Sequence, residues 1–171
     1  PFLFQGDEMG LANYDFTSME QITDVEAKGY YAEHVRSEPA DRVFARILAG
    51  TREHARVMLP WNEKLPPEHE GLRQEPKEEV FTAYRRLLRM RHKEKAFVYG
   101  TFRVLNRKKD RFVYARKLGE RAYVVDCNLG EGSCRAFLSK GQWKLVYDTV
   151  APGLRTAKTL QGYEARIWRR L

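Results

Sequence analysis

The sequence predicts an α+β protein, with helical segments in its first half and an antiparallel β domain in its last third. Apolar residues recur at helical spacing over 77–95, which predicts a long amphipathic helix. From residue 98 onward apolar and polar residues alternate, as in strands with one buried face. The chain opens on the apolar run Pro1 to Phe4, which is typical of a strand buried on both faces. With 171 residues, 43% of them hydrophobic, the chain can bury a core in one domain or two small ones.

The region between the opening strand and the long helix is acidic and irregular. Helical pieces are predicted over roughly 18–36 and 39–54. Three prolines and Gly71 then mark an exposed loop over 56–71, because proline and glycine interrupt both helix and strand. We therefore expect a long insertion between two regular elements.

The helix over 77–95 is the most clearly defined element. Glu78 and Glu79 lie in its first turn and Lys93 and Lys95 lie near its last, so their charges complement the helix dipole. Its apolar stripe at helical spacing consists of Val80, Tyr84, Leu87 and Leu88.

Short alternating segments predict the strands of the last third. They are separated by the turn sequences "RKKD", "LGE" and "LGEG". We expect them to form an all-β sandwich domain over 99–171, with a domain boundary after residue 98. The predicted strands are 100–106, 111–118, 121–128, 133–139, 143–149 and 163–170.

The net charge of +8 is unevenly distributed. Residues 1–83 carry 9 basic against 16 acidic side chains, residues 84–121 carry 14 against 3, and residues 122–171 carry 8 against 4. A basic block interleaved with aromatic residues is typical of nucleic-acid binding. The same composition also arises from a solvated helix face and outward strand positions. A small nucleic-acid-binding module over 84–121 is therefore the alternative function, but the structural interpretation is favoured and no specific nucleic-acid partner is expected.

No catalytic group is recognisable from spacing alone. Asp7 and Glu8 are neighbours at a predicted strand end, so their side chains leave on opposite sides and cannot form the opposed pair that glycoside cleavage needs. Gly130 and Gly132 lack the following Lys-Ser or Lys-Thr of a phosphate loop and predict a hairpin turn. Cys127 lies in an alternating strand, where a packed thiol is favoured over a nucleophile.

The cysteine and histidine content predicts neither a disulfide framework nor a metal site. Cys127 and Cys134 are the two cysteines, and the four histidines show no metal-ligand spacing with them. The sequence has no apolar run as long as a membrane span and no signal-peptide pattern, although a chain that starts without Met can follow an upstream segment. We expect a soluble, cytoplasmic protein with no cofactor, no metal and no membrane partner.

Several stretches together resemble one enzyme family. The opening "PFLFQGDEMGLANYDF" resembles the eighth-strand motif of the α-glucosidase and oligo-1,6-glucosidase branch of the alpha-amylase family, glycoside hydrolase family 13. The stretch "TDVEAKGYY" is similar to the family's following helix, and "TREHARVMLPWNE" aligns without gaps on a segment that usually contains Arg-Thr-Pro-Met-Gln-Trp-Asp. The stretches "FTAYRRLLRMRHKEKAFVYGTF" and "LQGYEARIWRRL" resemble the last barrel helix and the closing strand of the C-terminal β domain.

The resemblance implies a fold and an activity for a longer protein. It makes residues 1–98 the last strand, a long loop and helical insertion and the last helix of a (β/α)8 barrel, with residues 99–171 as the C-terminal β sandwich. In such barrels the active site lies at the C-terminal ends of the strands. The family's nucleophilic Asp, acid/base Glu and stabilising Asp belong to earlier strands, and their motifs do not occur here. The implied enzyme is a retaining α-glucosidase that acts on α-linked gluco-oligosaccharides, and these residues without the earlier barrel strands are expected to be inactive.

The resemblance also implies roles for individual residues. Arg56 falls on the Arg of the family's motif and would fix the terminal glucose, and this role is favoured over the alternative of a surface ion pair. Glu26 matches an acid that approaches the following sugar, or is an ordinary helix-surface residue. Trp61 is a sugar platform or a packed loop aromatic. The segment from Gln5 to Asn13 would form one wall of the active site, and Glu8 within it would hold the barrel rim by hydrogen bonds.

Overall fold

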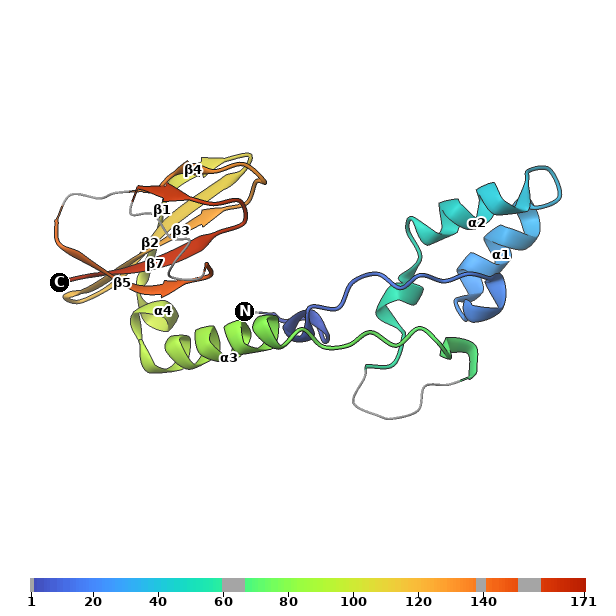
Figure 1. Cartoon of the computed structure of the whole chain (residues 1–171), viewed down its shortest axis with the longest axis horizontal. Helices are drawn as coiled ribbons and strands as arrows, with labels where there is room; N and C mark the ends of the chain where they lie inside the picture. Colours follow the sequence, from blue (N-terminus) through green and yellow to red (C-terminus); the bar gives the residue numbers. More distant parts are fainter. Residues whose placement is uncertain (1, 60–66, 138–140, 151–157) are drawn as a thin grey trace. The chain divides into compact units, whose positions relative to one another are not determined.

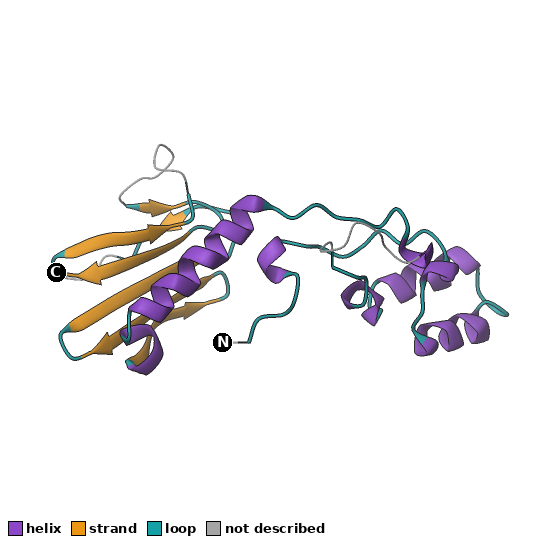
Figure 2. Cartoon of the chain, turned by 90° about the horizontal axis from the view of Figure 1, so that it is seen from below, coloured by secondary structure: helices purple, strands orange, loops and turns teal. Residues whose placement is uncertain are grey.

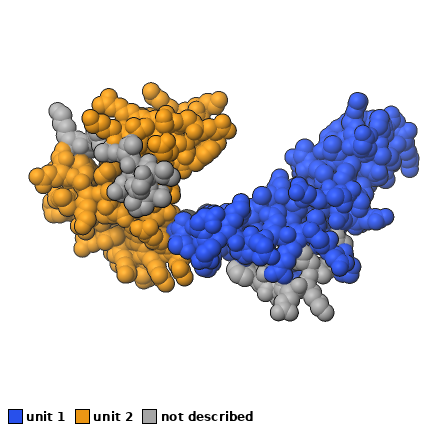
Figure 3. Space-filling model, viewed as in Figure 1, with its two compact units in different colours: residues 1–84 blue, residues 85–171 orange. Residues whose placement is uncertain are grey.

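A computed structural model describes residues 2–59, 67–137, 141–150 and 158–171 (Figure 1). The chain divides into two compact units, residues 1–84 and 85–171 (Figure 3). The division falls inside one helix, α3, which spans Glu78–Lys93. The division between the two units therefore lies before residue 98, where the sequence predicts the domain boundary. That boundary stays a prediction.

The described elements of the first unit that precede α3 are all helical. The 3-10 turns η2 and η3 flank the two α-helices, and the segments between them break the longer helices predicted over 18–36 and 39–54. Thr51 caps η3, because its Oγ1 accepts the Glu53 N–H at 3.2 Å. The elements are η1 (Asp7–Met9), η2 (Met19–Gln21), α1 (Val25–His34), α2 (Ala40–Leu48), η3 (Arg52–Ala55) and η4 (Pro67–His69).

The predicted opening strand is not found in the described residues. Residues 2–4 are exposed and have no regular structure, because no described segment offers them the hydrogen-bonding partner that a strand needs. Asp7 and Glu8 lie in the 3-10 turn η1 and not at a strand end. Gly6 and Gly10 flank this turn with φ angles of +100° and +66°, which glycine adopts without strain.

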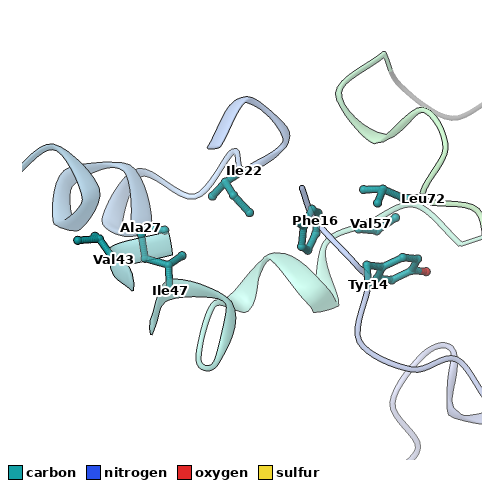
Figure 4. Close-up of a cluster of buried hydrophobic side chains, with 8 residues drawn as sticks. All are labelled: Tyr14, Phe16, Ile22, Ala27, Val43, Ile47, Val57 and Leu72. Atoms are coloured by element: carbon teal, nitrogen blue, oxygen red, sulfur yellow. The ribbon is translucent and has the colours of Figure 1, made fainter. Parts of the chain in front are cut away.

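The first unit has its own small hydrophobic core between α1, α2 and the flanking loops (Figure 4). Val43 and Ile47 are one helical turn apart on α2 and face Ala27 of α1, which holds the two helices together. The core thereby places the start of α1 beside the turn that follows α2. The buried members are Tyr14, Phe16, Ile22, Ala27, Val43, Ile47, Val57 and Leu72.

The second unit is an antiparallel β domain preceded by the end of α3 and by α4 (Ala96–Tyr99). Its five-stranded sheet has the order β1-β2-β3-β7-β5, and β4 pairs with β6 in a second, two-stranded sheet. Of the strand predicted over 133–139, residues 133–137 are described and contain β4, and β6 was not predicted. The strands are β1 (Thr101–Lys108), β2 (Arg111–Leu118), β3 (Arg121–Asn128), β4 (Cys134–Arg135), β5 (Trp143–Asp148), β6 (Thr159–Leu160) and β7 (Ala165–Arg170).

Helical residues cover one face of the five-stranded sheet (Figure 2). Ala96 of α4 is fully buried against Tyr123 and Val125 of β3. The Tyr123 hydroxyl donates to Glu94 Oε2 at 2.6 Å, and Arg116 Nε donates to the Ala96 carbonyl at 3.1 Å. These bonds attach the turn between α3 and α4 to the sheet.

Buried charges connect the large sheet to the small one. Asp126 of β3 is fully buried, lies 2.5 Å from Arg111 Nη2 and accepts the Phe137 N–H at 2.7 Å. Arg166 of β7 donates to the Thr159 carbonyl of β6 at 2.9 Å. Asp126 and Arg166 therefore each have at least one polar partner, whereas Arg111 Nε is buried with no hydrogen-bond partner among the described residues. Among the described residues, no helix is long and apolar enough to cross a membrane.

Candidate functional site

Two arginines converge on one buried carboxylate in the first unit. Asp24 directly precedes α1, and its Oδ1 accepts hydrogen bonds from Arg56 Nη1 at 2.9 Å and from Arg52 Nη2 at 3.1 Å. Arg52 also donates to Glu26 Oε2 at 2.7 Å. The Asp24 side chain is 8% exposed, whereas those of Arg56 and Glu26 are 45% and 80% exposed. We call Asp24, Glu26, Arg52 and Arg56 the arginine–carboxylate cluster.

A second buried acid fixes the turn that carries both arginines. Glu53 lies between Arg52 and Arg56 in the chain and is fully buried. Its carboxylate accepts the Thr23 and Asp24 N–H groups at 3.0 and 2.8 Å and the Thr23 hydroxyl at 2.8 Å. Because the hydrogen bonds join η3 to the start of α1, Glu53 sets the geometry in which Asp24 meets the two arginines.

His54 holds the other side of η3. Its Nδ1 accepts the Tyr14 N–H at 3.0 Å, and its Nε2 donates to the Leu48 carbonyl at 3.0 Å. An amide can only donate and a carbonyl can only accept, so the ring proton is on Nε2. Both ring nitrogens are thus used within the chain, which leaves this histidine a structural role.

Two open grooves lie on either side of η3. The first has a volume of about 510 Å³ and runs between α1 and α2, where Glu26, Tyr30, Arg46 and Arg52 line it. The second has a volume of about 210 Å³ and is bordered by the opening segment and by the residues that follow η3. Its polar lining is made by Gln5, Asp7, Asn13, Tyr14 and His54.

The predicted site residues fall into three groups. Gln5 and Asn13 line the second groove, and Glu26 and Arg56 belong to the arginine–carboxylate cluster. Glu8 lines neither groove and accepts the Gly6 N–H at 3.0 Å, which stabilises its own turn. The predicted platform Trp61 lies outside the described residues.

Sequence reasoning missed three members of this arrangement: Asp24, Arg52 and Glu53. The available signal was the pair of arginines four residues apart with an acid between them. That spacing alone does not show which acid they reach, because the partner lies 28 and 32 residues earlier in the chain. Only folding of α1 against η3 reveals the cluster.

The buried carboxylates of this arrangement are occupied by hydrogen bonds within the chain, whereas Arg56 and Glu26 keep exposed polar groups. Asp24 is held by two guanidinium groups and Glu53 by three hydrogen bonds, so neither carboxylate is poised to act as a nucleophile or base. Burial raises the pKa of the Tyr14 phenol beside the second groove, which keeps this group protonated. Within residues 2–59, 67–137, 141–150 and 158–171, no three His, Cys, Asp or Glu side chains gather as a metal site.

Comparison with known proteins gives matches along nearly the whole chain. The chain is 27% identical to an oligo-1,6-glucosidase of Halalkalibacterium halodurans over 98% of its residues and 35% of that protein. It is 26% identical to a glucan 1,6-alpha-glucosidase of Streptococcus pneumoniae over 96% of its residues and 34% of that protein. The chain thus spans about a third of the length of these curated relatives.

A solved structure agrees with these relatives. The isomaltulose synthase of Klebsiella sp. LX3 superposes with a TM-score of 0.74 at 25% identity, and the match covers 99% of this chain and 35% of that one. No protein-family model matches the chain. The resemblance of its motifs is nevertheless confirmed: over almost all its residues, the chain is similar to the C-terminal part of the oligo-1,6-glucosidases and glucan 1,6-alpha-glucosidases of the alpha-amylase family.

Proposed function

We propose that these residues are the C-terminal part of a retaining α-glucosidase that hydrolyses short α-glucans such as isomalto- or malto-oligosaccharides. The observation that carries this proposal is the arginine–carboxylate cluster, in which Asp24 and Arg52 are hydrogen-bonded to each other and link the motif residues Arg56 and Glu26. The comparison supports it, because the two relatives are an oligo-1,6-glucosidase and a glucan 1,6-alpha-glucosidase.

In this proposal Arg56 positions the terminal glucose of the substrate. A guanidinium presents several N–H donors in one plane, so Nη1 can stay on Asp24 while the exposed remainder donates to sugar hydroxyls. Glu26 would accept hydrogen bonds from the next sugar. Gln5 and Asn13 would form part of the active-site wall, and the second groove supports this placement because both residues line it.

The catalytic carboxylates would come from the part of the enzyme that precedes this chain. We propose that residues 1–98 contribute the last strand position, the active-site loop and the last helix of a (β/α)8 barrel, with the β domain following. The apolar surface of α3 supports this, because Phe81, Leu87 and Leu88 are 36%, 36% and 44% exposed. Side chains of this size on an amphipathic helix are expected to pack against further structure.

The test compares the chain with an extended protein, defined as the same chain together with the residues encoded upstream of it. The extended protein is expected to hydrolyse a chromogenic α-glucoside with retention of anomeric configuration, and the purified 171-residue chain is expected to show no turnover above the blank. The proposal would be overturned if the chain alone showed turnover and if substitution of one of its own carboxylates abolished that turnover. An extended protein that folds and has no glucosidase activity would also overturn it.

A further inference from the structure

The groove between α1 and α2 has lining residues to which the proposed function assigns no role. Its lining charges are balanced, with Asp24 and Glu26 against Arg46 and Arg52. Its volume of about 510 Å³ is in the range of small-molecule sites, which is roughly 300–1,000 Å³. The groove is therefore large enough for a ligand and has no excess charge to select an anion.

Each arginine of the groove is already paired within the chain. Arg46 donates to Glu38 Oε2 at 2.6 Å and to the Tyr30 hydroxyl at 2.6 Å, while Arg52 is held by Asp24 and Glu26. A paired guanidinium keeps N–H donors for hydroxyl groups but has little charge left to attract a phosphate. The groove is thus suited to a neutral ligand that is rich in hydroxyl groups.

The groove also has an apolar part and a fixed aromatic residue. Ala27 and Ile47 belong to the core of the unit and reach the groove from α1 and α2. Tyr30 stacks on His34 with ring centroids 3.9 Å apart and planes 19° apart, and Arg46 holds its hydroxyl. Apolar surface beside a few rigid polar groups is the usual composition of a ligand site, and it matches the C–H and O–H surfaces of a sugar.

The groove is continuous with the arginine–carboxylate cluster, because Glu26 and Arg52 belong to both. We infer that it binds the sugars of an α-gluco-oligosaccharide that extend beyond the two residues next to the cleaved bond, with Tyr30 and Arg46 as positioning contacts. The choice of an α-glucan rests on the proposed function. The neutral, hydroxyl-rich class of ligand rests on the groove alone.

The test uses the 171-residue chain as it is, because every lining residue of the groove lies within 24–52. Isotope-labelled chain is titrated with isomaltose and isomaltotetraose, and amide shifts are followed by NMR. We expect saturable shifts within residues 24–52, with an affinity at least ~3-fold higher for the tetrasaccharide because it makes more contacts in the groove. Absence of saturable shifts with the tetrasaccharide would overturn the inference, as would shifts confined to other residues.

The variant Arg46→Met should weaken tetrasaccharide binding by at least ~5-fold, since a charged hydrogen-bond donor is lost. Glu38→Gln is the matched control: it removes the same Arg46–Glu38 ion pair but changes no lining residue, so it should bind like the parent. Equal binding by a folded Arg46→Met chain would contradict the inference. If Arg46→Met unfolds α2, Tyr30→Phe takes its place, and unchanged binding by that variant would contradict the inference equally.

Two further arms separate the ligand class and the proposed function. Glucose 6-phosphate should not compete, and competition stronger than that of glucose would show an anion site instead. If the chain binds the tetrasaccharide but the extended protein is inactive, the inference about the groove is supported and the proposed function is rejected. Hydrolysis by the extended protein without binding in the groove would reject only this inference.

Discussion

Arg56 donates a hydrogen bond from Nη1 to Oδ1 of Asp24 at 2.9 Å, which anchors a half-exposed guanidinium on a buried carboxylate. Arg52 shares the same oxygen at 3.1 Å. Removal of Arg56 therefore does not leave Asp24 without a charged partner. A binding role of Arg56 can therefore be tested apart from a structural role, because the fold is expected to tolerate the loss of this side chain.

The contact between Arg56 and Asp24 depends on Glu53, which joins η3 to the start of α1. Replacement of Glu53 should therefore destabilise the first unit. In Glu53→Gln the amide oxygen can still accept the Thr23 and Asp24 N–H groups, but the charge is lost and an N–H₂ group replaces the oxygen that accepts the Thr23 hydroxyl, so the three hydrogen bonds are weakened. We expect the opening free energy of α1 and α2 to fall by about 2 kcal/mol. Hydrogen exchange of the amides in these helices measures it directly.

Glu26→Gln is the matched control for this measurement. Its side chain is 80% exposed and its partner Arg52 keeps Asp24, so the opening free energy should change by less than about 0.5 kcal/mol. Equal exchange rates in the two variants would show that the Glu53 hydrogen bonds do not hold η3 to α1.

Stability should fall at alkaline pH through Tyr123. Burial and the hydrogen bond to Glu94 raise the pKa of this phenol from 10.0 to about 12. The neutral phenol is favoured in the folded state, so this stability is fully present below pH 10 and is lost as the pH rises towards 12. Urea unfolding of the second unit between these pH values should show the loss, and Tyr123→Phe should reduce it. An equal alkaline slope in both proteins would assign the loss to another group.

The β domain should fold without the first unit. Ala96 and Phe97 cover the sheet from the helical side, so a polypeptide of residues 75–171 is expected to be monomeric and to melt cooperatively. Residues 1–98 alone are expected to aggregate or stay largely unfolded, because the end of α3 and α4 then have no sheet to cover, whereas in the whole chain the sheet is present and the first unit keeps its own core. Limited proteolysis with a mass readout tests this in the whole chain, and a protected core that begins near residue 1 and ends before residue 98 would reverse it.

The basic block over 84–121 should bind nucleic acid only weakly. Tyr99 and Phe102 are 71% and 52% exposed, but Phe102 and Phe112 both lie against Tyr114, with ring centroids 5.1 and 5.4 Å apart, which leaves few free aromatic faces for bases. A single-stranded oligonucleotide should therefore bind loosely and dissociate as salt rises. Sub-micromolar binding at physiological salt that Tyr99→Ala weakens would favour the nucleic-acid alternative instead.

Local patterns in the sequence predicted the elements whose partners are close in the chain. The helix α3 and the hairpin strands β1, β2 and β3 lie within one or two residues of their expected bounds, because periodicity and turn residues define them locally. The position of β7 between β3 and β5 depends on pairing between segments distant in the sequence, which local sequence patterns do not determine. The expected opening strand is not formed by the described residues 2–4 for the same reason, since a strand needs a neighbouring strand to pair with.

The candidate site shows the same limit. Family motifs singled out Arg56 and Glu26, but not the buried residues that hold them. Asp24 and Glu53 look like ordinary surface acids in the sequence, because burial and partners of a charged side chain are set by tertiary packing. A pair of arginines flanking an acid is therefore a reason to search for a buried carboxylate.

The central claim is that this chain supplies a substrate-binding arginine to an α-glucosidase, and the kcat/KM of Arg56→Ala in the extended protein tests it most directly. We expect a fall of at least ~10²-fold, on the order of 3 kcal/mol for a lost charged hydrogen-bond pair, with little change in Tm because Asp24 keeps Arg52. Arg56→Lys should recover only part of the loss, since an ammonium group cannot donate to Asp24 and to a sugar in one plane. An unchanged kcat/KM for Arg56→Ala would contradict the claim and leave Arg56 as a surface ion pair.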